Sequence, residues 1–274
     1  MPVISLLNQK GGVGKTSTTH HLAGTLALMG KRVLLVDNDP QASLSQGFWG
    51  PVTTAELDPA ATVAALYSGL DPFPEQVIRP SGIVGIDIVP GSRAATDYNV
   101  PRPYEAPPEA QKCIRALLDE VRDRYDLVLI DCPPNLHLCS WAALVASDYL
   151  IVPLQPEDYG AQGLGPVQES VDLVANGPNP ALHLLGFLLT MHNARLAIHK
   201  LYEQLLREQY GPAVFETRVP YAADFKEAIA RRQAIAQYKP RGSSAKALRT
   251  LADELLARLA AADGRCIGAG KEAA

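Results

Sequence analysis

The stretch NQKGGVGKTS, residues 8–17, decides the fold class of this 274-residue chain. It follows a short apolar run and precedes a helical pattern, and its glycines let successive backbone N–H groups converge on anionic oxygens. A helix that begins here adds unpaired N–H groups and a dipole that favour phosphate. Lys15 can then reach the β- and γ-phosphates, and the Thr16 hydroxyl can bind Mg²⁺. The stretch predicts a phosphate-binding loop formed by Lys10, Gly11, Gly12, Val13, Gly14, Lys15, Thr16 and Ser17.

Two further apolar runs end in aspartates. The run 32–36 is followed by Asp37 and Asp39, which project on the same side of the strand because they are two residues apart. Beside a triphosphate, such carboxylates can hold Mg²⁺ through water or orient an attacking water. The run 127–130 is followed by Asp131, in the arrangement of a Walker-B strand whose carboxylate binds the Mg²⁺ shell. Together with the loop, these strand ends predict an ATPase.

Apolar runs alternate with helical patterns along the whole chain. Most runs are apolar throughout, as expected for strands covered on both faces. The alternation predicts an α/β fold, a doubly wound, mostly parallel sheet flanked by helices, with ligands at the carboxyl ends of the strands. The expected strands are 3–7, 32–36, 83–89, 127–130, 149–154 and 184–189, and the expected helices are 15–29, 62–68, 109–124, 138–146, 163–175, 197–209 and 243–262. We expect one domain over residues 1–274, with surface loops at 71–80 and 101–108 and a flexible tail at 263–274.

Composition limits the class of protein. A hydrophobic content of 47% and a charged content of 20% are those of an ordinary globular protein. No signal peptide is recognisable, and no apolar stretch reaches the roughly 18 residues of a membrane span. The cysteines Cys113, Cys132, Cys139 and Cys266 lack C-x-x-C spacing, which indicates reduced thiols rather than a metal site.

The net charge of −4 conceals an asymmetry along the chain. Residues 190–250 hold eleven Lys/Arg and five Asp/Glu, a local charge of +6 that leaves −10 for the remainder. A basic segment on an acidic protein either binds a polyanion or forms a solvated helical surface.

The motifs KGGVGKTS, VDNDPQAS and VLIDCPPN resemble the ParA/MinD family of deviant Walker-A P-loop ATPases. Residues 152–157, 188–191 and 234–238 also look like ParA/Soj partition proteins, so the resemblance covers about residues 2–262. The usual pattern G-x-x-x-x-G-K-[ST] has glycine where this chain has Gln9, and Lys10 is an additional lysine. The resemblance implies ATP and Mg²⁺ as cofactors and a homodimer that closes on two ATP molecules.

The resemblance also assigns roles to residues of the site. Lys10 reaches the partner's phosphates and supplies in trans the charge of an arginine finger, Lys15 holds the phosphates, and Asp39 positions the water. The metal site is made by Thr16, Asp37 and Asp131. Val219 and Pro220 lie beside the adenine.

ParA-like members bind DNA non-specifically as ATP dimers, through basic residues near the C-terminus. Arg195 matches one arginine of the family, whereas Tyr221 and Asp224 occupy the region of a second. Because phosphate contacts require charge density more than particular positions, other basic residues can substitute; these are Lys226, Arg231, Arg232, Lys239, Arg241, Lys246 and Arg249. The resemblance therefore implies chromosome or plasmid partitioning by a cytoplasmic, nucleoid-associated ATPase whose slow hydrolysis is stimulated by a ParB-like partner.

Three other functions are alternatives to this one. A MinD-like membrane-cycling ATPase requires a C-terminal amphipathic anchor with basic flanks, which the segment GRCIGAGKEAA does not supply, so we expect no membrane partner. A metal-cluster scaffold requires paired cysteines at cluster-binding spacing, and Cys132 and Cys139 lack it. A ParA-like positioner of non-DNA cargo stays open, because a partner protein chooses the cargo.

Overall fold

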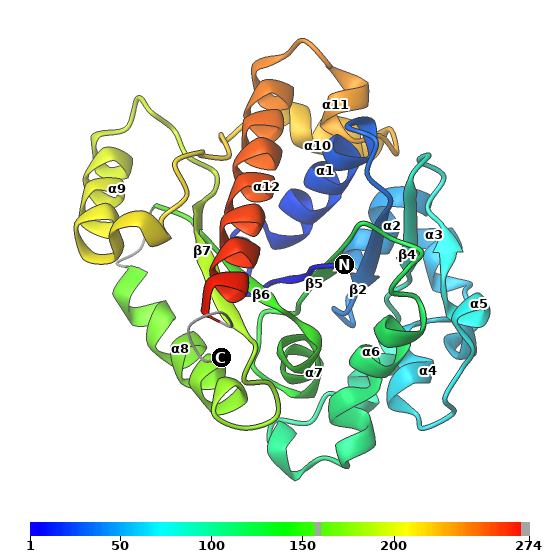
Figure 1. Ribbon diagram of the computed structural model, residues 1–274. Helices are drawn as coiled ribbons and strands as arrows, with labels where there is room; N and C mark the ends of the chain where they lie inside the picture. Colours follow the sequence, from blue (N-terminus) through cyan, green and yellow to red (C-terminus); the bar gives the residue numbers. More distant parts are fainter. Residues whose placement is uncertain (157–159, 270–274) are drawn as a thin grey trace.

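A seven-stranded sheet runs through the centre of the molecule (Figure 1). The computed structural model describes residues 1–156 and 160–269. The strand order is β3-β4-β2-β5-β1-β6-β7, and all neighbours are parallel except β3 and β4. The strands are β1 (Val3–Leu6), β2 (Val33–Asp37), β3 (Arg79–Pro80), β4 (Ile86–Val89), β5 (Leu127–Asp131), β6 (Tyr149–Leu154) and β7 (His183–Leu189). The prediction of a doubly wound, mostly parallel sheet is confirmed.

Helices cover both faces of this sheet (Figure 1). On one face α1, α11 and α12 pack together, and on the other α6 packs against α7 and α7 against α8. The α-helices are α1 (Lys15–Leu28), α2 (Ser43–Trp49), α3 (Pro51–Ala55), α4 (Val63–Tyr67), α5 (Pro74–Val77), α6 (Pro108–Glu120), α7 (Leu138–Ala146), α8 (Gly160–Ala175), α9 (Ala197–Tyr210), α10 (Ala223–Ala230), α11 (Ile235–Tyr238) and α12 (Ser243–Ala269). Short 3₁₀ helices are η1 (Pro59–Ala61), η2 (Arg93–Tyr98), η3 (Pro103–Glu105) and η4 (Gly211–Ala213).

The core consists of two apolar layers, one on each face of the sheet. Leu34 and Val36 of β2 belong to the layer under α6, α7 and α8, whereas Val33 and Leu35 belong to the layer under α1 and α12. Successive side chains of a strand point to opposite faces, so a strand buried on both faces is apolar throughout. This is the physical reason for the continuous apolar runs of the sequence.

The structure differs from the expected elements mainly in short helices. Helices α2, α3, α10 and α11 are not among the expected elements, because they have between four and eight residues and are too short for a recognisable apolar period. The expected loop 71–80 contains α5 and β3, and the proline-rich stretch 101–108 contains η3 and the first residue of α6. Proline is tolerated there because the first turn of a helix leaves its N–H groups unpaired.

The last helix is longer than expected. It continues to Ala269, although a tail was expected from residue 263, and residues 270–274 lie outside the described part. The added segment, residues 263–269, contains two glycines, and a single glycine within a helix costs only about 1 kcal/mol. Among the described residues, no helix is long and apolar enough to cross a membrane.

Candidate functional site

The segment between β1 and α1 forms an anion-binding loop. Gly12 and Gly14 have φ values of 78° and 82°, a left-handed conformation that other residues adopt only at a cost. Gly14 is the N-cap of α1, so it offers no side chain to the helix end, and the first turn holds no acidic residue. The N–H groups of this turn therefore remain available for an anion, at the positive end of the helix dipole.

Lys15 lies across the loop that it follows. Its side chain is buried, and Nζ donates to the carbonyl oxygens of Asn8 at 3.0 Å and Lys10 at 3.1 Å. Burial lowers the pKa of Lys15, and the nearby Asp131 opposes this shift. The ammonium is thus held at the loop by carbonyl groups, which phosphate oxygens of greater charge can replace.

Asn8 fixes the other side of the loop. Its buried side chain accepts from the Lys10 N–H at 2.9 Å and donates to the Pro153 carbonyl at 2.8 Å. The loop is therefore tied to the end of β6. Lys10, Gly11 and Gly12 are exposed at its tip.

Two carboxylates face each other at the ends of β2 and β5. Asp37 and Asp131 are register partners, and both are fully buried. Burial raises the pKa of Asp37 to about 7 and that of Asp131 well above its usual range; Thr16 and Lys15 oppose the shift at Asp131. Both oxygens of Asp131 and Oδ1 of Asp37 have no hydrogen-bond partner among the described residues.

Unpartnered buried carboxylate oxygens are rare, because a buried charge needs a counter-charge. Hard oxygen donors next to a hydroxyl are the ligands that Mg²⁺ prefers. Thr16, Asp37 and Asp131 therefore fit a magnesium ion beside the phosphate loop.

The second oxygen of Asp37 is held in place by residues that sequence reasoning missed. Asp37 Oδ2 accepts from the Ser45 N–H at 2.8 Å and the Ser45 hydroxyl at 2.6 Å, and the Gly91 N–H donates to that hydroxyl at 2.9 Å. A Cβ atom at Gly91 would lie only 2.7 Å from Asp37 Cγ. The contact depends on the approach of chain segments 54 residues apart, so no local pattern could have revealed it.

Asp39 lies at the mouth of the site. It is partly exposed, and its Oδ1 accepts from the Gln41 N–H at 2.9 Å. Its neighbour Asn38 is fully buried: Nδ2 donates to the Cys139 carbonyl at 2.6 Å, and the Tyr67 hydroxyl donates to Oδ1 at 2.8 Å. These bonds fix the backbone between Asp37 and Asp39.

The end of β7 closes the loop from the side. The Thr190 hydroxyl donates to the Val13 carbonyl at 2.7 Å, and the His192 N–H donates to the Val219 carbonyl at 2.9 Å. Pro220 forms an isolated bridge with His192. Val219 and Pro220 therefore lie on the segment that runs beside the end of β7, whose Thr190 contacts the phosphate loop.

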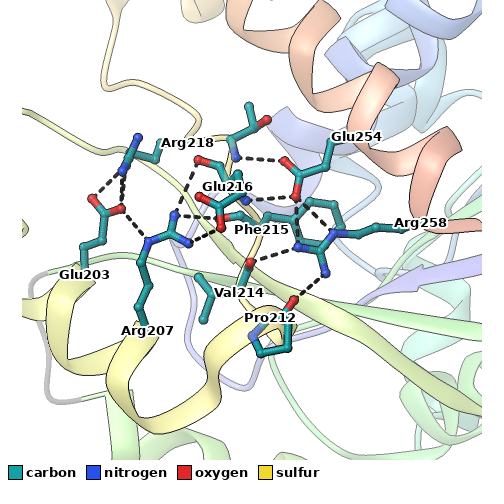
Figure 2. Close-up of polar contacts among 10 residues, drawn as sticks. Glu203, Arg207, Pro212, Val214, Phe215, Glu216, Arg218, Glu254 and Arg258 are labelled. Carbon is teal, nitrogen blue, oxygen red and sulfur yellow. Dashed lines mark hydrogen bonds and ion pairs between the residues drawn. The ribbon is translucent and has the colours of Figure 1, made fainter. Parts of the chain in front are cut away.

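Two ion-pair clusters hold the chain that leads into Val219 (Figure 2). Glu203 of α9 accepts from Arg207 at 2.9 Å and from Arg218 at 2.7 Å. Glu254 of α12 accepts from the backbone N–H groups of Glu216 and Thr217, each at 2.8 Å. Residues 216–218 are thus clamped between two helices.

The basic residues proposed for DNA fall into two groups. Arg232 donates to the Gln46 carbonyl at 2.9 Å and so satisfies the C-terminal end of α2, and Lys239 pairs with Asp224 at 2.6 Å and Glu227 at 3.2 Å. The charge of Lys239 is therefore paired inside the molecule, which charge counting could not detect, whereas Arg232 keeps its charge and is exposed. The other six are exposed as well: Arg195, Lys226, Arg231, Arg241, Lys246 and Arg249.

A buried histidine joins these basic segments to the helix that follows the loop. His21 of α1 accepts from the Ile235 N–H through Nδ1 at 3.0 Å, and its Nε2 donates to the Phe225 carbonyl at 3.1 Å. Burial lowers the pKa of His21 to about 4, so the ring is neutral and can accept through one nitrogen and donate through the other. The basic residues between α10 and α12 are anchored to α1.

Known proteins resemble this chain over most of its length. The AAA domain family matches residues 1–184. The chromosome-partitioning ATPase Soj of Thermus thermophilus is 37% identical, over 93% of this chain and 96% of that protein. The sporulation initiation inhibitor protein Soj of Bacillus subtilis is 33% identical, over 93% and 98%.

A solved structure extends the comparison to bound ligands. Cobyrinic acid a,c-diamide synthase of Mycobacterium smegmatis, with an ATP analog and magnesium, is 26% identical, covers 93% of this chain and 94% of its own, and has a TM-score of 0.78. Nucleotide and magnesium are thus found in a relative of the same fold. The chain belongs to the ParA/MinD family, as an ATPase of the ParA/Soj partition type.

Proposed function

We propose that this chain is an ATP- and Mg²⁺-dependent dimerising ATPase that binds DNA non-specifically and segregates a chromosome or plasmid. A ParB-like partner stimulates its slow hydrolysis. The observation that carries the ATPase part is the meeting of an uncapped helix end, Lys15 and the two unpartnered carboxylates Asp37 and Asp131. A metal–triphosphate complex requires such a combination of positive and negative groups, which supports the proposal.

The residues of the site divide the work of hydrolysis. The N–H groups of α1 and the Lys15 ammonium bind the β- and γ-phosphates, and Thr16, Asp37 and Asp131 hold Mg²⁺, which neutralises charge on the phosphate oxygens. Asp39, at the mouth of the site, accepts a hydrogen bond from the attacking water and orients it. Exposed Lys10 extends to the phosphates of a second protomer, which makes activity depend on the dimer.

The DNA-binding part rests on the seven exposed basic residues, Arg232 included, and the local charge of +6. A monomer of net charge −4 offers one such surface, and an ATP-closed dimer offers two. The bound dimer would therefore be nucleoid-associated in the cytoplasm, and hydrolysis would release it.

A positioner of non-DNA cargo is the second candidate. It is favoured by the departures at Tyr221 and Asp224 and by the two carboxylate partners of Lys239, which reduce the charge available to DNA.

A mobility-shift assay separates the two candidates. The Asp39→Ala protein, held as an ATP dimer, should shift unrelated duplexes alike at low salt and release them at high salt. Lys15→Ala is the matched control, because it keeps the basic surface and loses the nucleotide. The absence of any ATP-dependent shift at low salt would exclude the DNA mechanism and favour other cargo.

A further inference from the structure

Two adjoining cavities lie along α6. One, of about 580 Å³, lies between the end of α4, the turn that follows it and α6; the other, of about 530 Å³, lies between η2, η3, α6 and the start of α7. Tyr67, Pro107 and Ala110 line both, so the cavities form one continuous depression. We call it the α6 groove, after the helix whose 13 residues give it a length of about 20 Å.

The α6 groove has an apolar floor and an acidic rim. Its floor includes Leu66, Leu117 and Leu138, and Val100 at its edge is 39% exposed. The charged residues of the lining are all exposed, and acidic ones predominate; they are Asp71, Asp97, Glu105, Glu109 and Glu120 against Arg102 and Lys112. Arg102 is moreover paired with Glu105 at 3.2 Å. The groove therefore matches a segment with an apolar face and basic flanks.

The wall of the α6 groove is hydrogen-bonded to the catalytic loop. Tyr67 lies between the two cavities, and its hydroxyl donates to Asn38, the residue between Asp37 and Asp39. Asn38 in turn donates to the carbonyl of Cys139, whose own N–H donates to Asn99 at 2.9 Å. Asn99 lies between two residues that line the groove. A movement of Tyr67 or Asn99 is therefore transmitted through these hydrogen bonds to Asn38 and to the backbone of its neighbour Asp39.

We propose that the α6 groove binds a basic, amphipathic segment of the activating partner protein, and that Tyr67 and Asn38 transmit this binding to Asp39. The inference rests on the proposed function, since it assigns the surface through which stimulation occurs. Tyr67 acts here as a positioning residue. A segment of about four helical turns spans the groove, its apolar side on Leu117 and Ala110 and its basic side chains at the rim.

The test measures ATPase rate against the concentration of the proposed ParB-like partner, using full-length proteins. Asp97→Lys with Glu120→Lys reverses the rim, and Ala110→Phe fills the floor without a change of charge. Both should keep the basal rate and need at least tenfold more partner for half-maximal stimulation. The matched control reverses two exposed acids elsewhere, Glu169 of α8 and Glu208 of α9, and should behave as the unmodified protein.

Tyr67→Phe distinguishes binding of the partner at the α6 groove from transmission of that binding to Asp39. The ring that lines the groove stays, and the hydrogen bond to Asn38 is lost. The half-saturating partner concentration should therefore be unchanged, while maximal stimulation falls several-fold. A change in the half-saturating concentration alone would overturn the transmission step.

Each remaining outcome decides between the proposals. If the partner stimulates the unmodified protein and the groove and control variants alike, the α6 groove is not its site and the proposed function stands. If the groove variants instead lose ATP-dependent dimerisation in size-exclusion chromatography, the groove contacts a second copy of this chain and the proposal is overturned. If the partner does not stimulate the unmodified protein, the proposed function fails and this inference with it.

Hydrogen exchange offers an independent readout. The partner should protect the backbone amides of residues 97–110 from exchange, and protection confined to other segments would contradict binding at the α6 groove.

Discussion

Gly91→Ala should displace Asp37 of the predicted Mg²⁺ site, although Gly91 itself is not a predicted metal ligand. The added Cβ atom would lie 2.7 Å from Asp37 Cγ, 2.7 Å from Asp37 Oδ2 and 2.9 Å from Ala42 Cα. Contacts under 3.0 Å require movement, and two of these atoms belong to a fully buried carboxylate while the third is backbone. Overpacking of this kind costs about 1–3 kcal/mol of folding free energy. Loss of the hydrogen bond from the Gly91 N–H to Ser45 would add about 1 kcal/mol.

Two measurements check this expectation. The unfolding free energy from urea titration should fall by about 2–4 kcal/mol, the sum of these two costs. Because Asp37 must shift, calorimetry should show ATP affinity reduced about tenfold with Mg²⁺ present, equivalent to about 1.4 kcal/mol, and nearly unchanged with chelator. Gly165→Ala is the control: its Cβ would meet nothing within 4 Å, and alanine in a helix should stabilise the protein. A Gly91→Ala protein as stable as the original, with unchanged affinity for Mg-ATP, would refute the reasoning.

Three further substitutions test the roles assigned around the phosphates. Lys15→Ala should abolish ATP binding, because no other side chain reaches the phosphates from within the loop; unchanged affinity in calorimetry would exclude the phosphate-loop assignment. Asp39→Ala should bind ATP but hydrolyse it at under a hundredth of the original rate, consistent with general-base contributions of about 10²–10⁴, and should elute as a stable dimer; a normal rate would contradict its role. Lys10→Ala should bind ATP as a monomer but neither dimerise nor hydrolyse, and hydrolysis at the native rate would show that Lys10 makes no contact in trans.

The sequence predicted those parts of the site that lie in one strand, loop and helix. The phosphate loop and Asp131 each follow a buried strand, and parallel strands end at the same edge of a sheet, so their proximity could be inferred. Ser45, Gly91, Tyr67 and Thr190 could not be found in this way, because each reaches the site from another segment of the chain.

The fold was predictable to a similar degree and for a similar reason. Strands buried on both faces and long amphipathic helices have recognisable periods, whereas helices of four to eight residues, such as α2 and α11, are stabilised by what they pack against. Counting charges likewise indicated a basic region but not which charges are internally paired. Lys239 has the same sequence character as Lys246, yet only Lys239 has carboxylates within 3.2 Å among the described ion pairs.

That distinction yields a prediction about DNA. Arg231 and Lys246 are exposed, whereas Lys239 is occupied by Asp224 and Glu227. A phosphate contact contributes about −0.9 to the slope of log K against log salt, and a symmetric dimer presents each residue twice. Replacing Arg231 or Lys246 by glutamine should therefore reduce the slope by about two and weaken binding equally for all sequences.

Lys239→Gln provides the matched test, because it removes the same charge from the same region. The substitution breaks the ion pairs of Lys239 with two carboxylates and removes no contact with a DNA phosphate. The slope of log K against log salt should therefore stay within one of its original value. Fluorescence anisotropy of the ATP-bound Asp39→Ala dimer on a labelled duplex, from low to moderate salt, measures all three variants. If Lys239→Gln lowered the slope as much as Arg231→Gln, DNA would be competing successfully for a paired lysine, and the internal pairing could not define the binding surface. If none of the three changed the slope while the unmodified dimer bound DNA, the contact surface would lie elsewhere, with Arg195 the next exposed basic residue to substitute.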